Sequence, residues 1–372
     1  MLTIPDGGST LADRVFSAAA IDFSRLARVV VAVSGGGDSS ALLYLLHDHW
    51  VGKLKRSPAD LCAVTVNHRV RPEASDEANE VAAWCKGLGI VHHHVSWDGG
   101  SVKSGFQAAA RMARYEKLSA VAETFGDAVV VTGHTWDDQI ETLMMRSARR
   151  EDGFGLAGIP PATLYDRKTW FARPLLNTRR ENLRTVLRQR ALQWFDDPSN
   201  LNEDYERVRV RNSALADGGH LWQRSRAAAK ERLADAQKSA LWIRHHARLS
   251  QNGEHSQHIY CSIDGTTLPE AAAAIGYLLM LVGGQQQRPK EDKVGRAIKS
   301  CLSKQGASFT LAGCLLARRD DRLEVTAEAR NQGRGHFGLD RLLPFWEFEV
   351  LHAIDQLRGR PKVGSPLFCR FD

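Results

Sequence analysis

Residues 29–43 have the sequence VVVAVSGGGDSSALL, and the fold of this 372-residue chain is organised around them. The first five residues are apolar and four of them are β-branched, which is typical of a buried strand. The glycines at 35–37 permit a tight turn with positive φ, and Asp38 and Ser39 suit the first turn of a helix. Such a turn directs free backbone N–H groups and the positive helix end at one place. The stretch therefore predicts an anion-binding site.

Two common nucleotide-binding loops do not match this stretch. It lacks the Gly-Lys-Ser/Thr that closes a Walker A loop, and Ser40 occupies the third glycine position of the Rossmann pattern. It resembles instead the pyrophosphate loop of the N-type ATP pyrophosphatases, which split ATP between the α and β phosphates and adenylate their substrate. The residues that match, and that the resemblance implies bind ATP, are Ser34, Gly35, Gly36, Gly37, Asp38 and Ser39. The simpler alternative is a glycine turn with no ligand.

The composition is that of an ordinary folded protein. Hydrophobic residues make up 43% and charged residues 25%, and the net charge of +7 permits a polyanionic partner without proving one. The longest apolar run, residues 271–282, is too short to cross a bilayer, and the N-terminal region has no apolar signal segment. The six cysteines form no CxxC pair, which disfavours a zinc ribbon or an iron–sulfur site. We expect a protein of the reducing cytoplasm with no membrane association.

Strands and helices alternate through the first 150 residues. Strands are expected at 29–33, 61–66, 90–95 and 128–132, with helices between them. This alternation predicts an α/β fold with a parallel sheet and helices on both faces. Ligands bind such sheets beyond the carboxyl ends of the strands. Because Ser34, His68 and His134 each follow a strand, we expect them to meet at that edge.

The pattern changes after residue 150. Glycines and prolines predict a loop to Pro161, and a basic helix is expected at about 179–190. Helices over 221–248 and 268–304, followed by a hairpin at 309–325, predict a mainly helical C-terminal region. The expected boundaries are 1–215 for the α/β domain, 216–330 for a mainly helical domain with a terminal hairpin, and 331–372 for an unassigned tail.

A second polar group follows the fourth expected strand. His134, Asp137, Asp138 and Glu141 are spaced as one face of a helix. Carboxylates on one face repel each other, and a divalent cation would remove that conflict; ATP chemistry requires Mg²⁺. The alternative is an acidic first turn that only complements the helix dipole.

Arg111 and Arg114 lie on an expected helix over 106–125. A guanidinium binds phosphate through two hydrogen bonds, so either arginine could hold a phosphate of ATP. The alternative is a solvated arginine, and the sequence does not distinguish the two residues.

Several motifs occur in an order that resembles the tRNA(Ile)-lysidine synthetases. The resemblance is dense over residues 28–212 and faint beyond them. Besides the glycine stretch, its motifs are Val66-Asn67-His68, Arg111-x-x-Arg114-Tyr115, Gly133-His134-x-x-Asp137-Asp138-Gln139-x-Glu141-Thr142, Arg173-Pro174-Leu175-Leu176, Asp197-Pro198-Ser199-Asn200 and Arg207-x-x-x-Arg211-Asn212.

The resemblance implies a two-step ligation. ATP would adenylate the C2 oxygen of the wobble cytidine in a tRNA(Ile) with a CAU anticodon, and L-lysine would then displace AMP to give lysidine, which reads AUA. It assigns Asp38, Arg111, Arg114 and His134 to catalysis or the ATP phosphates, and Asp137, Asp138 and Glu141 to Mg²⁺ and the lysine ammonium. The resemblance also implies that 1–215 is the catalytic domain and that 216–330 binds tRNA or another substrate. Contacts with tRNA phosphates are expected from Arg173, Arg179, Arg180, Arg184, Arg188, Arg207 and Arg211.

Other functions remain open. Within the same superfamily, the alternatives are a tRNA thiolase or an amide-forming synthetase fed by glutamine. No cysteine lies beside the motifs, and no cysteine follows Met1 as an amidotransferase nucleophile would. A non-catalytic RNA-binding protein is a third alternative, which the intact acidic residues disfavour. The oligomeric state stays open, with a dimer as one option.

Overall fold

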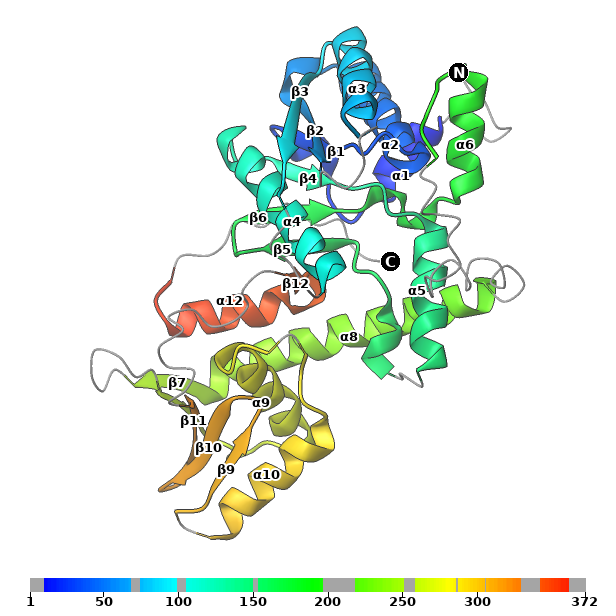
Figure 1. The fold of residues 1–372 in the computed structure, drawn as a ribbon. Coiled ribbons are helices and arrows are strands. Elements are labelled where there is room, and N and C mark those ends of the chain that lie inside the picture. Colours follow the sequence, from blue (N-terminus) through cyan, green and yellow to red (C-terminus); the bar gives the residue numbers. More distant parts are fainter. Residues whose placement is uncertain are drawn as a thin grey trace. The chain divides into compact units, whose positions relative to one another are not determined.

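The structure is a computed structural model, and it describes residues 10–67, 74–98, 105–149, 153–196, 218–250, 258–285, 287–304, 306–328 and 342–360. The chain forms two units, and the boundary follows Ala228, inside helix α8 (Gly218–His246). Figure 1 shows the course of the chain through both. The domain boundary expected at residue 215 lies outside the described residues.

The first unit is built on a mostly parallel sheet. Its strands, in the order β5-β6-β4-β1-β2-β3 across the sheet, are β1 (Val29–Ala32), β2 (Leu61–Asn67), β3 (Val91–Ser96), β4 (Val129–Val131), β5 (Ala162–Tyr165) and β6 (Thr169–Ala172). All the neighbours are parallel except β5 and β6, which form an antiparallel hairpin. The apolar run of β1 is buried, with Val29 and Val30 fully covered. The predicted α/β sheet is confirmed, whereas the β5–β6 hairpin was not predicted.

Helices cover both faces of this sheet. They are α1 (Leu11–Ser17), α2 (Gly37–His47) with a π-helical extension (Asp48–Lys53), α3 (Ala74–Leu88), α4 (Phe106–Thr124), α5 (Trp136–Ala148) and α6 (Arg180–Gln189). Short 3₁₀ turns occur at Phe23–Arg25, Pro58–Asp60, Gly153–Ala157 and Pro174–Asn177. The chain passes from β1 to β2 to β3 and then returns to β4 on the other side of β1. Right-handed crossovers therefore place α2 and α3 on one face and α4 on the other, as Figure 1 shows.

That return creates a switch point between β1 and β4. The connections that leave these two adjacent strands run in opposite directions, which opens a crevice beyond their carboxyl ends. The glycine loop follows β1, and the segment that contains His134 follows β4. The topology alone thus brings the two predicted groups of site residues to the same edge.

The second unit contains the expected helices and, in addition, an antiparallel sheet of which only one hairpin was predicted. Its elements besides α8 are β7 (Ala247–Ser250), β8 (His258–Cys261), α9 (Leu268–Val282), α10 (Glu291–Ser303), β9 (Ser308–Leu311), β10 (Cys314–Arg319), β11 (Arg322–Ala327), β12 (Leu343–Pro344), a 3₁₀ turn (Phe345–Glu347) and α12 (Phe348–Leu357). A five-stranded antiparallel sheet, in the order β7-β8-β11-β10-β9, lies at its centre. Strands this short carry few alternating positions, so their periodicity in the sequence is weak.

Two finer expectations for this unit are confirmed. The hairpin around Arg319–Arg322 is the β10–β11 connection, where these two residues are paired. The apolar run at 271–282 is a core helix: every residue from Ala271 to Val282 of α9 is buried. None of the helices in the described ranges has the length and apolar character needed to span a bilayer.

Candidate active site

The glycine loop leaves the first turn of α2 without a side-chain cap. Gly35 has a φ of +81°, and Gly36 is the N-cap of α2. Within the described ranges, no side chain caps the N–H groups at this N-terminus. The loop is held by Ser39, whose Oγ accepts a hydrogen bond from Ser34 N at 3.1 Å and donates one to Gly36 O at 3.0 Å. This is the geometry of a phosphate site.

Two adjacent aromatic residues, Trp194 and Phe195, pack against the glycine loop. Phe195 N donates to Gly35 O at 2.9 Å, and its ring stacks on Trp84 with centroids 5.9 Å apart. The Trp194 ring lies against Gly37, where a Cβ would come within 3.3 Å of it. This role of the two aromatic residues was not predicted from the sequence. The only signal was the presence of two adjacent aromatics just before Asp196.

The end of β4 packs against the start of α2. A Cβ on Gly133 would lie 3.1 Å from Ser39 N, so a larger residue would push the two backbone segments apart. Thr135 then caps α5 in a reciprocal box with Asp138: Thr135 N donates to Asp138 Oδ2 at 2.7 Å. The expectation that His134 shares a helical face with the three carboxylates is wrong. His134 precedes the cap and is not helical, and its Nδ1 lies 2.9 Å from Thr132 Oγ1.

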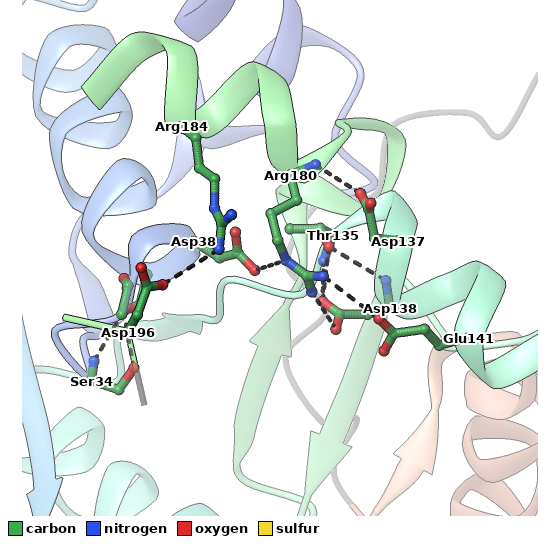
Figure 2. A network of polar contacts seen from close by, with 11 residues as sticks. Ser34, Asp38, Thr135, Asp137, Asp138, Glu141, Arg180, Arg184 and Asp196 are labelled. Carbon is green, nitrogen blue, oxygen red and sulfur yellow. Dashed lines mark hydrogen bonds and ion pairs between the residues drawn. The ribbon is translucent and has the colours of Figure 1, made fainter. Parts of the chain in front are cut away.

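Arg180 of α6 connects the glycine-loop helix to α5, as Figure 2 shows. Its Nε donates to Asp38 Oδ2 at 2.8 Å, and its Nη2 donates to Asp138 Oδ1 at 3.1 Å. Its Nη1 forms an ion pair with Glu141 Oε1 at 3.5 Å. Its backbone N donates to Asp137 Oδ2 at 2.7 Å, so Asp137 caps the N-terminus of α6. The two groups of predicted residues therefore share one site.

The electrostatics of this site favour a bound cation. The Arg180 side chain is 16% exposed and that of Glu141 only 3%. Burial raises the pKa of Asp38, an effect that Arg180 opposes and that Asp138 and Asp137 reinforce. Burial works against the charged guanidinium, yet Asp38 and Asp138 together raise the pKa of Arg180. Among the described residues, the carboxylates of Asp38, Asp138 and Glu141 outnumber the single guanidinium that they contact, and we call these three carboxylates the acidic pocket.

The donors suit Mg²⁺ in their chemistry, because Mg²⁺ prefers carboxylate oxygens. Asp38 Oδ1 is buried and has no hydrogen-bond partner among the residues that the structure describes. Within the same residues, however, no three acidic, histidine or cysteine side chains are grouped as a metal site. The guanidinium of Arg180 stands between the carboxylates instead.

Arg111 and Arg173 belong to a second cluster, around Tyr115. Arg111 Nη2 and Arg173 Nη2 both donate to Tyr115 Oη, at 3.1 Å and 3.0 Å. Burial alone would raise the pKa of Tyr115, but Arg173 and Arg111 lower it below its ordinary value. Arg173 is only 4% exposed and also donates to Pro160 O. This place does not fit the expected contact with tRNA phosphate, because the guanidinium is enclosed by protein. Arg114 lies on the same helix, α4.

The remaining arginines of α6 are more open to solvent. Arg179 lies 4.5 Å above the Trp136 ring, Arg184 pairs with Asp196 at 3.4 Å, and Arg188 pairs with Glu181 and is 54% exposed. Arg180 differs from them, since it faces the acidic pocket. His68, Arg207, Arg211 and the Asp197–Asn200 motif lie outside the described residues.

The sheet, the glycine loop after β1 and the acidic start of α5 define a PP-loop protein, and a model of the PP-loop domain matches residues 11–217. This domain implies ATP as the nucleotide. The tRNA(Ile)-lysidine synthase of Mesorhizobium japonicum is 47% identical over 57% of this chain and 46% of its own length. That of Rhizobium meliloti is 36% identical over 82% of this chain and 68% of its own length. The chain belongs to the tRNA(Ile)-lysidine synthase family.

The chain spans between 46% and 68% of the length of these two relatives. Among solved structures, a U34-tRNA thiolase from Methanococcus maripaludis is 16% identical, with a TM-score of 0.46 over 59% of this chain and 76% of that chain.

Proposed function

We propose that this chain ligates L-lysine to C2 of the wobble cytidine in tRNA(Ile) with a CAU anticodon, through an adenylated cytidine. Membership of the family supports the proposal. The observation that carries it is the Arg180 bridge, whose guanidinium pairs with Asp38 on the glycine-loop helix and with Asp138 on α5. Phosphates held by the loop and a cation held by the carboxylates would therefore meet in one crevice, as the reaction requires.

In the first step the C2 oxygen of cytidine attacks the α-phosphorus of ATP, and pyrophosphate leaves. The free N–H groups at the start of α2 would hold the phosphates. Asp38, whose Oδ1 has no partner in the described part of the chain, and Asp138 would hold Mg²⁺. When bound, Mg²⁺ neutralises phosphate charge. Arg111 and Arg114 of α4 remain our candidates for a further phosphate contact.

In the second step the ε-amine of lysine attacks C2, and AMP leaves. The nearly buried Glu141 and its neighbour Asp138 would attract the lysine ammonium, since opposite charges interact strongly where water is excluded. The ammonium must lose a proton before it attacks. A pocket carboxylate or His134 would accept this proton, and Thr132 fixes the orientation of the His134 ring.

For the tRNA we propose contacts from the basic side chains that lie away from the acidic pocket. Arg179, at the N-cap of α6, and Arg184 and Arg188 within it could contact phosphates. They would give up only their present surface contacts, which are weak. We also propose tRNA contacts for Arg207 and Arg211, on the sequence resemblance alone. We no longer propose them for Arg173 and Arg180, because both side chains are engaged inside the protein. A cytoplasmic location belongs to the same proposal.

Cysteine chemistry receives no support from the described cysteines. Cys62, Cys85, Cys261, Cys301 and Cys314 are all buried and unpaired. Burial raises the pKa of Cys62 and of Cys85 to about 12, so neither is a ready thiolate nucleophile at neutral pH. This favours lysine ligation over sulfur transfer.

The test is mass spectrometry of a CAU-anticodon tRNA(Ile) transcript after incubation with the protein, ATP, Mg²⁺ and lysine. We expect cytidine 34 to gain one lysine less one water, with pyrophosphate release that requires both tRNA and lysine. A transcript with uridine at position 34 and the Asp38→Asn variant are the controls, and neither should give product. Modification with sulfide or glutamine in place of lysine would assign the chain to another PP-loop reaction.

A further inference from the structure

The acidic pocket already contains a cation, the guanidinium of Arg180. Each of its three nitrogens faces a different carboxylate: Nε faces Asp38, Nη2 faces Asp138 and Nη1 faces Glu141. These carboxylates come from two helices, α2 and α5, while the arginine comes from a third, α6. The arginine therefore holds together a pocket that its own helix does not form, as Figure 2 shows.

The position of Arg180 is unfavourable for its own helix. Arg180 is the first residue of α6 and Arg179 is its N-cap, where the positive end of the helix dipole repels cations. Asp137 compensates by accepting from Arg180 N at 2.7 Å, so α5 supplies the cap that α6 lacks. The benefit of placing a guanidinium here must lie in the pocket, where it separates carboxylates that would otherwise repel each other.

The fit of this cation is incomplete. Among the described residues, the carboxylates of Asp38, Asp138 and Glu141 face a single guanidinium, so one positive charge meets three negative ones. The contact with Glu141 is long, at 3.5 Å, and Asp38 Oδ1 is buried without a partner in the described part of the chain. A small cation of higher charge density would bind these oxygens better than a planar guanidinium does.

We propose that Arg180 is the resident counter-ion of the acidic pocket, and that the incoming cation displaces it from Asp38, Asp138 and Glu141. The displaced guanidinium then becomes available to phosphate, the anion that it binds best. Arg180 is thus a positioning residue that keeps the carboxylates in place until the cation arrives. The inference depends on the proposed function only for the identity of that cation, which is Mg²⁺ or the lysine ammonium.

The test is direct titration of the protein with Mn²⁺, as a paramagnetic substitute for Mg²⁺, without ATP, tRNA or lysine. We compare the wild type with Arg180→Gln and with Arg190→Gln, a control that removes the same charge from the end of α6, where Arg190 pairs with Asp48. Removing the competing charge should tighten Mn²⁺ binding by Arg180→Gln at least about tenfold. Arg190→Gln should stay within about twofold of the wild type, because its charge lies outside the pocket.

Arg180→Lys provides a second comparison that retains the charge. A lysine ammonium cannot face all three carboxylates as the guanidinium does, so its Mn²⁺ affinity should lie between those of the wild type and Arg180→Gln. If Arg180→Gln fails to fold, tighter binding by Arg180→Lys than by the wild type still supports the inference. Equal or weaker binding by the folded Arg180 variants overturns it for a metal ion.

The same proteins are titrated with L-lysine alone. Tighter lysine binding by the Arg180 variants identifies the ammonium as an exchanging cation, and no gain for either ligand rejects displacement altogether. Because neither titration involves turnover, they can succeed where the modification assay fails. In that event the displacement of Arg180 is supported and the proposed lysine ligation is rejected.

Discussion

Two features of the structure require glycine at position 35: a positive φ and a side chain that leaves no room for a Cβ. Its φ is +81°, and a Cβ built on it would lie 2.8 Å from Cδ2 of Phe195. The glycine is therefore required by the packing of the protein itself, independently of any phosphate.

We expect Gly35→Ala to lower the free energy of unfolding by about 1–3 kcal/mol, because the new methyl group strains the backbone and displaces Phe195. ATP binding should weaken with it, as the loop loses its shape. The measurements are denaturant unfolding and ATP titration. Gly52→Ala is the matched control, since a Cβ on Gly52 would meet nothing within 4 Å. Equal stability of the two variants would contradict the packing role of Phe195.

Glu324 is a buried carboxyl group of the second unit. Its side chain is 6% exposed and accepts hydrogen bonds from Arg319, His258 and Tyr260. Burial raises its pKa, but these three partners together lower it below the ordinary value of 4.5.

A carboxyl group whose pKa is lowered on folding stabilises the folded state above its unfolded pKa. That contribution is lost as the pH falls from about 4.5 through the folded pKa. We expect wild-type stability to fall over this range more steeply than that of Glu324→Gln, which cannot titrate. Denaturant unfolding between pH 3 and 7 measures the difference. Parallel curves for the two proteins would show that Glu324 does not carry this effect.

At the scale of elements, α6 carries arginines in two different environments. Its N-terminus contributes Arg180 to the acidic pocket, whereas Arg184 and Arg188 lie one and two turns further along the helix. Leu183 and Leu187 between them are buried and attach the helix to the first unit.

We expect Arg184→Ala with Arg188→Ala to weaken tRNA binding and to reduce the slope of log affinity against log salt by about 1–2, as the loss of two phosphate contacts would do. ATP binding should remain unchanged, because neither guanidinium touches the glycine loop in the contacts described above. Filter binding over a range of salt concentrations measures the slope. An unchanged slope would place the tRNA backbone elsewhere on the protein.

The elements that the sequence predicted well are those with long, regular patterns. The valine runs of β1 and β4, the apolar residues of β2 and the alanine-rich α4 follow the pattern of one element type each. The β5–β6 hairpin escaped prediction because its four-residue strands follow a loop rich in glycine and proline. The sheet of the second unit escaped for a related reason: β9 is largely exposed, so it shows no apolar alternation.

At the scale of the whole molecule, the glycine loop and the acidic pocket both belong to the first unit. ATP should therefore protect amides there, and we expect slower hydrogen exchange in the first turn of α2 and the first turn of α5. The strands β9, β10 and β11 belong to the second unit and should keep their exchange rates. The measurement is hydrogen exchange with and without Mg²⁺-ATP. Protection confined to the second unit would exclude the glycine loop as the nucleotide site.

The local sequence was sufficient for the glycine turn, the parallel sheet around it and the presence of acidic residues after β4. Strand periodicity and turn chemistry act over a few neighbouring residues, so they can be recognised in one dimension. The different environments of the arginines could not be predicted from neighbouring residues. Arg173, Arg180 and Arg188 look alike in the sequence, and they became respectively a buried partner of Tyr115, the cation of the acidic pocket and a surface side chain.

Only the tertiary structure decided these roles, because the environment of a charge depends on groups that are distant along the chain. Asp38 and Arg180 are separated by 142 positions and come within 2.8 Å. Likewise, the aromatic pair at 194–195 lies on the glycine loop by virtue of the fold alone. The local sequence determined that the glycine loop has the form of an anion site, and folding determined that the Arg180 guanidinium lies beside it.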